Sequence, residues 1–197
     1  MTKFKDSVIV SFMGVDGSGK STLIKKLKKK LKRNFKAIKY LHLRPYLILL
    51  DKSEVNKNPH KFEERSNFFS FIILFYWLIE YKIFFLFNKR KKNQLIIFDR
   101  YVHDILIDKT RYRHSLSPSF TRKILNFFPE PDLWIILNVS SSIAEKRKKE
   151  LSKKELKRQI KEYIKFAKMK KNSIILNTNE NNSKNLLFLE KKIKDIF

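Results

Sequence analysis

The chain has 197 residues, the size of one compact domain, and 43% of them are apolar, enough to build a core. It has no cysteine, which excludes disulfides, cysteine–zinc sites and thiol catalysis. The 45 basic and 19 acidic residues give a formal net charge of +26. This charge raises the question of a nucleic-acid or membrane-surface protein, and it would equally attract anionic small molecules such as nucleotides.

The basic residues follow a pattern typical of a solvated surface. Lys, Asn, Ile and Phe are abundant together while Gly and Pro are scarce, as in proteins encoded by AT-rich sequence. In the lysine-rich segment 23–33, Leu23, Leu27 and Leu31 recur at helical spacing. This predicts a helix with one buried stripe and a basic face in water. We therefore expect no nucleic-acid partner, and keep a basic nucleotide- or nucleic-acid-binding protein without kinase activity as the non-enzyme alternative.

Strands and helices are expected to alternate along the chain. Short apolar, β-branched runs predict buried strands at 8–13, 37–43, 95–98, 133–139 and 173–176. Helices are expected after Lys20, over 68–87, after Ser117-Pro118, from about Ser141, after the capping-box pair Ser152 and Glu155, and after Ser183. This order predicts an α/β fold, a five-stranded parallel sheet with helices on both faces. Without a repeat or linker, residues 1–197 are expected to form a single domain.

The segment 68–87 is apolar and long enough to cross a bilayer. Glu80 and Lys82 lie inside it, and both would be costly at membrane depth. A helix buried in the core or at a subunit contact explains the segment without that cost. We therefore expect no membrane insertion. A homodimer is possible. Residues 1–6 are polar and the apolar stretch 8–13 is too short for a signal core, so a cytoplasmic location is expected.

A glycine-rich motif stands between the first predicted strand and helix. It fits G-x-x-x-x-G-K-[ST] and reads Gly14, Val15, Asp16, Gly17, Ser18, Gly19, Lys20, Ser21. Glycine lets the backbone turn tightly and aim several N–H groups at a phosphate. Lys20 would neutralise phosphate oxygens of ATP, Ser21 would ligate Mg²⁺, and Thr22 would reach a phosphate nearer the sugar.

Glycine scarcity narrows the class of enzyme. All three glycines of the chain lie in this motif. None is left for the Asp-x-x-Gly turn of guanine-nucleotide switches or for the glycine-rich signature of transport ATPases. What remains is chiefly a small kinase that moves phosphate onto a small-molecule acceptor.

A second group of polar residues follows the third predicted strand. Asp99 and Arg100 come at its carboxyl end, the edge where open α/β sheets bind ligands. Asp99 would hold a Mg²⁺-bound water, and Arg100 would clamp an acceptor phosphate with two hydrogen bonds.

At this point the sequence resembles the thymidylate kinase family. The resemblance rests on FMGVDGSGKSTL (12–23), FDRY (98–101), PEPDLWIILNVS (129–140) and the following Arg147. It implies a P-loop NTPase fold and transfer of the γ-phosphoryl of Mg-ATP to dTMP or a related nucleoside monophosphate. It further implies that Asp16 contacts the acceptor sugar hydroxyl, that Tyr101 lies beside that sugar, that Arg147 lies near ATP, and that 148–155 is a mobile lid.

Two features depart from that family. After the second strand only Arg44-Pro45 matches its Arg-Glu-Pro motif, leaving Arg44 as an acceptor contact, and no arginine matches the one that helps hold thymine. The stretches 101–113 and 150–159 resemble the thymidylate-kinase-like proteins of bacterial surface-polysaccharide pathways. Arg111 and Arg113 would then clamp the acceptor and Asp104 would act as a base or hydroxyl contact. A kinase of a sugar or sugar phosphate in surface-glycan biosynthesis is therefore the alternative.

Overall fold

The computed structural model describes residues 7–47, 63–89, 91–180 and 183–197. By its internal contacts the chain divides into two compact units. The first, called the sheet unit, comprises Met1–Leu43, Asn88–Tyr101 and Pro131–Phe197, and the second, called the helical unit, comprises Arg44–Phe87 and Val102–Glu130. The single domain expected from the sequence stays a prediction. Part of the loop expected at 46–67 lies outside the described residues.

The sheet unit is built on five parallel strands, as the sequence predicts. They are β1 (Ser7–Met13), β2 (Ala37–His42), β3 (Gln94–Asp99), β4 (Leu133–Asn138) and β5 (Ser173–Asn177). Their order in the sheet is β2-β3-β1-β4-β5, and every neighbouring pair is parallel. In this register Phe12 lies opposite Asp99. The end of β3 thus lies beside the end of β1, where the glycine-rich motif begins.

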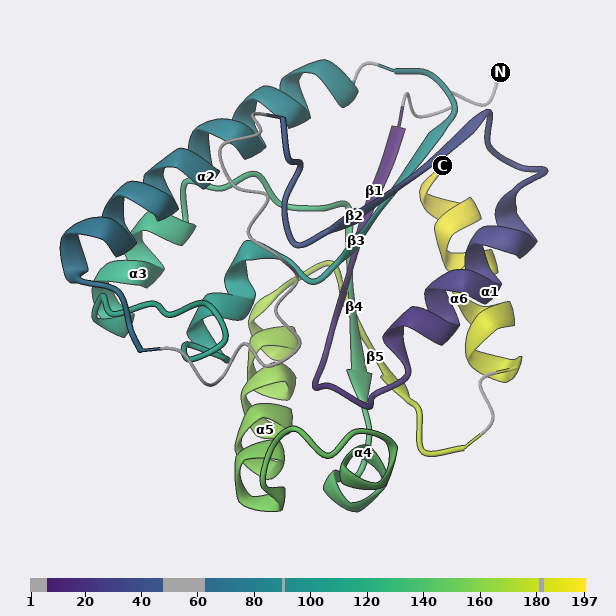
Figure 1. Cartoon of the computed structure of the whole chain (residues 1–197). Coiled ribbons are helices and arrows are strands. Elements are labelled where there is room, and N and C mark those ends of the chain that lie inside the picture. Colours follow the sequence, from purple (N-terminus) through teal and green to yellow (C-terminus); the bar gives the residue numbers. More distant parts are fainter. Residues whose placement is uncertain (1–6, 48–62, 90, 181–182) are drawn as a thin grey trace. The chain divides into compact units, whose positions relative to one another are not determined.

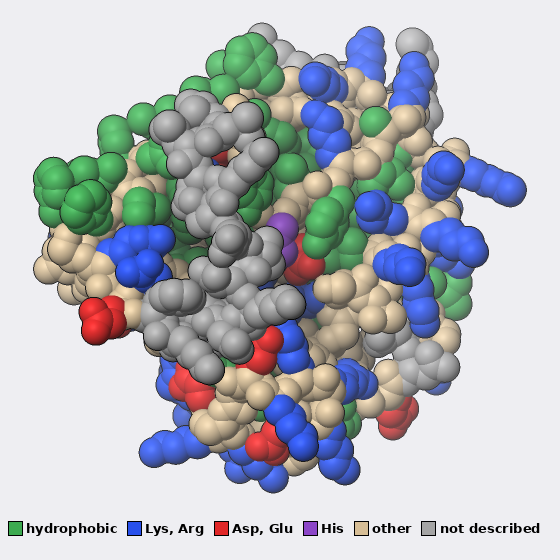
Figure 2. Space-filling model, viewed as in Figure 1, with side chains coloured by type: hydrophobic (Ala, Val, Ile, Leu, Met, Phe, Trp, Pro, Cys, Tyr) green, Lys and Arg blue, Asp and Glu red, His purple; other side chains and the backbone are tan. Residues whose placement is uncertain are grey.

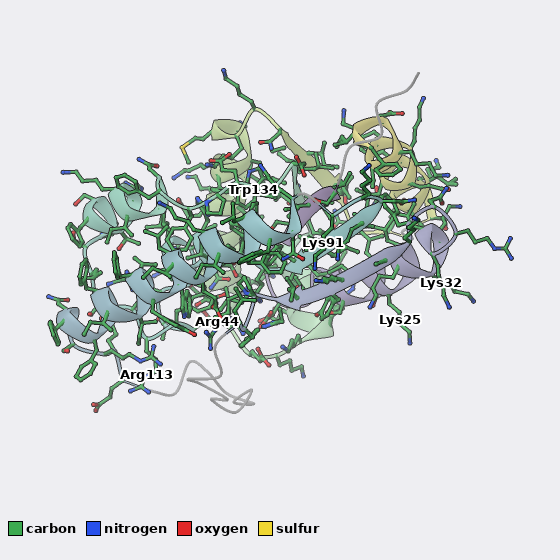
Figure 3. All side chains as sticks on the ribbon, turned by 90° about the horizontal axis from the view of Figure 1, so that it is seen from above. Lys25, Lys32, Arg44, Lys91, Arg113 and Trp134 are labelled. Atoms are coloured by element: carbon green, nitrogen blue, oxygen red, sulfur yellow. The ribbon has the colours of Figure 1, made fainter. Side chains whose placement is uncertain are left out.

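Helices cover both faces of this sheet (Figure 1). Helices α1 (Lys20–Leu31) and α6 (Ser183–Ile196) share one apolar core with the strands. The predicted stripe of α1, Leu23, Leu27 and Leu31, is fully buried there. Lys25 and Lys32 point away from the sheet into solvent (Figure 3). The lysine-rich segment is therefore a solvated face, as predicted.

The other face is covered by α5 (Lys153–Met169), which follows the short helix α4 (Ser141–Arg147). Trp134 of β4 packs edge-on against Phe166 of α5, with ring centroids 5.0 Å apart. The predicted cap of α5 is confirmed: Ser152 Oγ accepts the backbone N–H of Glu155 at 3.3 Å. The Glu155 carboxylate instead bonds Arg158.

The helical unit contains α2 (Asn67–Asn88), the short 3₁₀ helix η2 (Val102–Leu106) and α3 (Pro118–Leu125). Ser117 caps α3 by accepting the N–H of Phe120, as the Ser-Pro pair predicts. The buried side of α2 includes Tyr81, whose ring meets that of Phe128 at 5.4 Å. By length and composition α2 could cross a membrane, which is weak evidence because core helices of soluble proteins also pass this test. The expected absence of membrane insertion stays a prediction.

A buried ion pair explains the acidic residue within apolar α2. The Glu80 side chain is fully buried, and its Oε2 accepts Arg44 Nη1 at 3.1 Å. Its Oε1 accepts the backbone N–H of Leu47 at 2.6 Å. The Arg44 guanidinium also lies 4.4 Å from the ring centroid of Tyr46 and 5.9 Å from that of Trp77. The carboxylate thus has two donors, which lowers the cost of burying its charge.

Replacing Glu80 by glutamine is expected to destabilise the fold by about 3–5 kcal/mol, because it leaves the Arg44 charge buried without its counter-ion. Urea unfolding followed by circular dichroism measures this. Lys82→Ala, at an exposed position of the same helix, should change stability by less than about 0.5 kcal/mol. Equal unfolding midpoints for Glu80→Gln and the wild type would show that the pair contributes nothing.

His114 makes the stability of the fold sensitive to acid. Burial lowers its pKa to about 4, assisted by the charges of Lys109 and Arg65, and its Nε2 shares a 2.8 Å hydrogen bond with Thr121. The unfolded chain has the ordinary pKa of about 6.5, so it takes up the proton first. This contribution is therefore present above pH 6.5 and is lost as the pH falls toward 4, by about 1–2 kcal/mol between pH 7 and pH 5. Urea unfolding at several pH values should show a shallower loss for His114→Asn; an unchanged slope would contradict this.

Candidate active site

The glycine-rich bend joins β1 to α1, and its three glycines adopt backbone conformations that other residues rarely reach. Gly14, Gly17 and Gly19 have φ angles of 148°, 77° and 87°. A Cβ added at Gly17 would lie 2.4 Å from the carbonyl oxygen of Ala144 in α4. Both the dihedral and the close approach exclude a side chain there. The motif is thus folded as the tight turn that its spacing predicts.

Helix α1 starts directly on this bend. Gly19 forms its N-cap in the left-handed conformation, with no side-chain hydrogen bond to the cap. Ser21 and Thr22 lie exposed in the first turn. The free N–H groups at a helix start that follows a glycine-rich bend are suited to an anion such as phosphate.

Lys20 is folded against the same bend. Its side chain is buried, and Nζ donates to the carbonyl oxygen of Gly14 at 2.6 Å and to that of Val15 at 2.9 Å. A third contact reaches Ser18 Oγ at 3.4 Å. The ammonium group thus lies where it can reach a phosphate held by the loop amides.

An ion-pair network joins the bend to the end of β3. Arg100, which follows β3, pairs through Nη2 with Asp16 Oδ1, and the other oxygen of Asp16 lies 3.4 Å from Lys148 Nζ. Arg100 Nη1 is 3.5 Å from the hydroxyl of Tyr163 on α5. Both Arg100 and Asp16 are nearly buried. Asp16 and Arg100, which the sequence predicts separately as site residues, are therefore in contact with each other and with Lys148 of the segment 148–155. Tyr163 was not predicted as a site residue.

Asp99 is also held by a tyrosine that the sequence analysis missed. The hydroxyl of Tyr40, on β2, donates to Asp99 Oδ2 at 2.9 Å. Burial and the Asp99 carboxylate raise the pKa of Tyr40, so it stays a neutral donor. In the register of β2 with β3, Tyr40 lies opposite Ile97 rather than Asp99, so strand position alone does not reveal the pair.

The donor set suits Mg²⁺. Ser21 offers a hydroxyl and Asp99 a carboxylate, both hard oxygen ligands. Among the described residues there is no group of three or more His, Cys, Asp or Glu placed to hold a metal. Two protein ligands would leave the remaining positions of a Mg²⁺ ion to phosphate oxygens and water.

Arg147 and the proposed lid lie at the junction of α4 and α5. Arg147 Nη1 donates to the carbonyl oxygens of Gly17 and Thr178, both at 3.3 Å. In the segment 148–155, Lys148 bridges Asp16 and Glu150, whose oxygen lies 2.9 Å from Nζ. Arg147 thus braces the bend, and Lys148 contacts the ion-pair network. The lid role of 148–155 stays a prediction.

Tyr101 belongs to the core of the sheet unit. Its side chain is fully buried and meets the rings of Phe98 and Trp134 edge-on, at 5.1 and 5.0 Å. This packing accounts for an aromatic residue at the position. Its role beside an acceptor sugar stays a prediction.

The remaining acceptor candidates belong to the helical unit and are tied to neighbours there. Asp104 is fully buried, and its Oδ2 accepts the hydroxyl of Tyr112 at 3.0 Å. Arg111 Nε donates to Asp108 at 3.0 Å, and Arg113 Nε donates to the carbonyl oxygen of Glu63 at 2.7 Å. Arg44 is held by Glu80 as described above. Their roles toward an acceptor stay predictions.

Comparison with known proteins identifies the family. The family model for thymidylate kinase matches residues 12–196, nearly the whole chain. The chain belongs to the thymidylate kinase family. No curated protein sequence gives a significant match. As a member of this family the chain is an ATP-dependent phosphotransferase of the nucleoside monophosphate kinase type.

Solved structures support the fold of this thymidylate kinase family member. Thymidylate kinase from Ehrlichia chaffeensis is 17% identical, with a TM-score of 0.60 over 96% of this chain and 98% of that one. Thymidylate kinase from Candida albicans is 16% identical, with a TM-score of 0.63 over 96% and 92%. Deoxyadenosine kinase from M. mycoides, solved with bound dATP, is 17% identical, with a TM-score of 0.58 over 95% and 99%. The P-loop NTPase fold predicted from the sequence is thus confirmed.

Proposed function

We propose that this kinase transfers the γ-phosphoryl of Mg-ATP to dTMP or a related nucleoside monophosphate. The observation that supports this most directly is the contact network of the sheet unit. Lys20 lies against the phosphate bend, and Asp16, inside that bend, pairs with Arg100 at the end of β3. If the bend binds the donor phosphates and Arg100 binds the acceptor phosphate, these two groups lie next to each other at one edge of the sheet, as in-line phosphoryl transfer requires.

Each residue then has a task that its position permits. The backbone N–H groups of the bend and of the first turn of α1 bind the donor phosphates. Lys20 neutralises negative charge on their oxygens, and Arg100 aligns the acceptor phosphate. Asp16 orients the Arg100 guanidinium until an acceptor binds. Its carboxylate can also accept a hydrogen bond from a hydroxyl of the acceptor sugar. Ser21 and Asp99 would hold Mg²⁺, directly or through water, and this ion would neutralise phosphate charge.

Tyr40 and Lys148 complete this arrangement. The Tyr40 hydroxyl donates to Asp99 Oδ2, and the other carboxylate oxygen, Oδ1, would serve Mg²⁺ or its water. Lys148 lies in the segment proposed as a lid and can transfer from Asp16 to the phosphate being moved. We place this reaction in nucleotide biosynthesis in the cytoplasm, where both nucleotide substrates occur.

One observation favours the alternative acceptor class. The helix position from which the family's arginine would reach thymine has no arginine on α2, and the buried polar residue of this helix, Glu80, neutralises Arg44. Arg44 is then less available to a nucleobase. A sugar or sugar phosphate, which needs no base pocket, remains the second candidate, in line with the resemblance of 101–113 to proteins of surface-polysaccharide pathways.

An acceptor panel separates these functions. Purified protein is incubated with γ-labelled ATP, Mg²⁺ and one acceptor at a time: the nucleoside monophosphates, then hexoses and hexose phosphates. Labelled dTDP or another nucleoside diphosphate supports the proposal, and a labelled sugar product supports the alternative. Salt-dependent binding of DNA or RNA with no ADP release from any acceptor would favour the non-enzyme alternative.

A further inference from the structure

A hollow of about 610 Å³ lies in the sheet unit beside helix α5. This hollow, called here the α5 groove, has one wall of α5 side chains within 157–168 and an end formed by 138–141 and Asn179. Figure 2 shows Lys and Arg side chains gathered at the bottom of the view, where Figure 1 draws α4 and α5. The volume lies within the range of roughly 300–1,000 Å³ that is usual for small-molecule sites, so the groove can hold a ligand.

Lysines make the α5 wall of this groove strongly positive. Four of them recur at helical spacing and line it: Lys157, Lys161, Lys165 and Lys168. Lys165 Nζ lies 2.7 Å from a carboxylate oxygen of Glu162. Among the residues that the structure describes, no carboxylate pairs with the other three lysines. Because like charges one turn apart on a helix repel each other, an anion bound between these lysines would relieve that repulsion. The wall therefore suits phosphate groups.

Two isoleucines give the groove an apolar part that α5 does not use for its own packing. The buried side of α5 includes Leu156, Tyr163 and Phe166. Ile160 and Ile164 line the groove instead and are only partly buried. On α1, by contrast, the apolar stripe beneath the lysines is fully buried. The lysine face of α1 is therefore a solvated surface, whereas the α5 groove can also bind an apolar ring.

The end of the groove supplies amide groups. Asn179 follows β5, and its Oδ1 accepts the backbone N–H of Ser140 at 2.7 Å, which holds this side chain in place. Asn138, the last residue of β4, also lines the groove. Asparagine amides can pair with the donors and acceptors on the edge of a nucleobase. An amide end, an apolar part and a basic wall together complement a nucleotide, which has a polar base edge, a flat ring and phosphates.

We propose that the α5 groove binds a nucleoside triphosphate, as a second nucleotide site besides the donor site at the bend. The base lies against the two isoleucines, with its edge toward Asn138 and Asn179, and the phosphates lie along the lysines. The described lining of the groove includes no residue of the bend 14–22, so the two nucleotides occupy separate sites. This proposal is independent of the acceptor of the kinase.

Binding stoichiometry tests the second site. Equilibrium dialysis with a labelled, non-hydrolysable ATP analogue and Mg²⁺, without acceptor, should give two equivalents per chain for the wild type. In Lys161→Glu with Lys168→Glu one of these equivalents should bind at least about tenfold more weakly, because charge-assisted hydrogen bonds to phosphate are lost. Lys25→Glu with Lys32→Glu is the matched control: it has the same spacing and the same change of charge on α1, where both side chains point into solvent (Figure 3). This control should keep both equivalents.

The other outcomes would overturn the proposal. A single equivalent in the wild type would show that the groove is no separate site, whether or not the groove variant weakens it. Two equivalents in the groove variant with unchanged affinities would place the second nucleotide elsewhere. Inorganic tripolyphosphate should compete only weakly for the groove, and competition as strong as that of the ATP analogue would show that no base is bound there. Lys20→Ala should weaken only the equivalent at the bend, so an error in the donor site would be seen separately.

Discussion

Replacing Lys20 by alanine is expected to lower kcat by at least about 10²–10³-fold, since a cation preorganised at the transferring phosphate stabilises charge that develops in the transition state. The Nζ of Lys20 lies 2.6 and 2.9 Å from two carbonyl oxygens of the bend that would hold the phosphates. Removing it takes away the contacts of Nζ with the bend but no part of the apolar core. The fold should therefore survive while turnover is lost.

The measurement is steady-state ADP release with saturating ATP and the acceptor found in the panel. Lys26→Ala is the matched control, because Lys26 is exposed on the same helix and one removed positive charge alone should barely change kcat. Circular dichroism and urea unfolding establish that both variants are folded. A folded Lys20→Ala enzyme with near wild-type kcat would show that the ammonium is not at the reacting phosphate.

The strands and the phosphate bend could be predicted because their determinants are local. Residues 8–13 are apolar and are followed at once by the chain's only glycines, which specifies strand, turn and helix in succession. The carboxyl end of β3 was likewise predicted as a ligand edge, because parallel strands end at the same side of a sheet. Asp99 and Arg100 occupy that edge in the structure.

The partners of these residues could not be predicted, because they come from distant elements. The bond from Tyr40 to Asp99 depends on the order of strands in the sheet, and that of Arg100 with Tyr163 depends on how α5 packs. Glu80 shows the same limit: the sequence reveals a costly charge in an apolar helix, but not that Arg44 neutralises it. By contrast, Arg111 and Asp108 are three residues apart, so their ion pair could have been anticipated.

Arg100→Ala is expected to raise KM for the acceptor by about 10–100-fold, with little change in the affinity for Mg-ATP, because charge-assisted hydrogen bonds contribute about 1.5–3 kcal/mol. Arg100 follows β3 and points at Asp16 within the bend, so it can exchange the Asp16 carboxylate for an acceptor phosphate. Lys20, by comparison, donates to the carbonyl oxygens of Gly14 and Val15. The two cations should therefore have separable effects, one on the acceptor and one on the transferring phosphate.

Three variants make this separation measurable. Initial rates at varied acceptor give KM, and calorimetry with a non-hydrolysable ATP analogue gives donor affinity. Arg100→Lys keeps the charge but loses the paired hydrogen bonds, so its acceptor KM should fall between those of the wild type and Arg100→Ala. Arg158→Ala, an exposed arginine paired with Glu155 on α5, is the control and should leave both constants unchanged. An equal loss of affinity for both ligands in Arg100→Ala would contradict the proposal. Arg100 would then hold the bend in place through Asp16 rather than bind the acceptor. In that variant Lys148 is the one ion-pair partner of Asp16, among those described above, that remains.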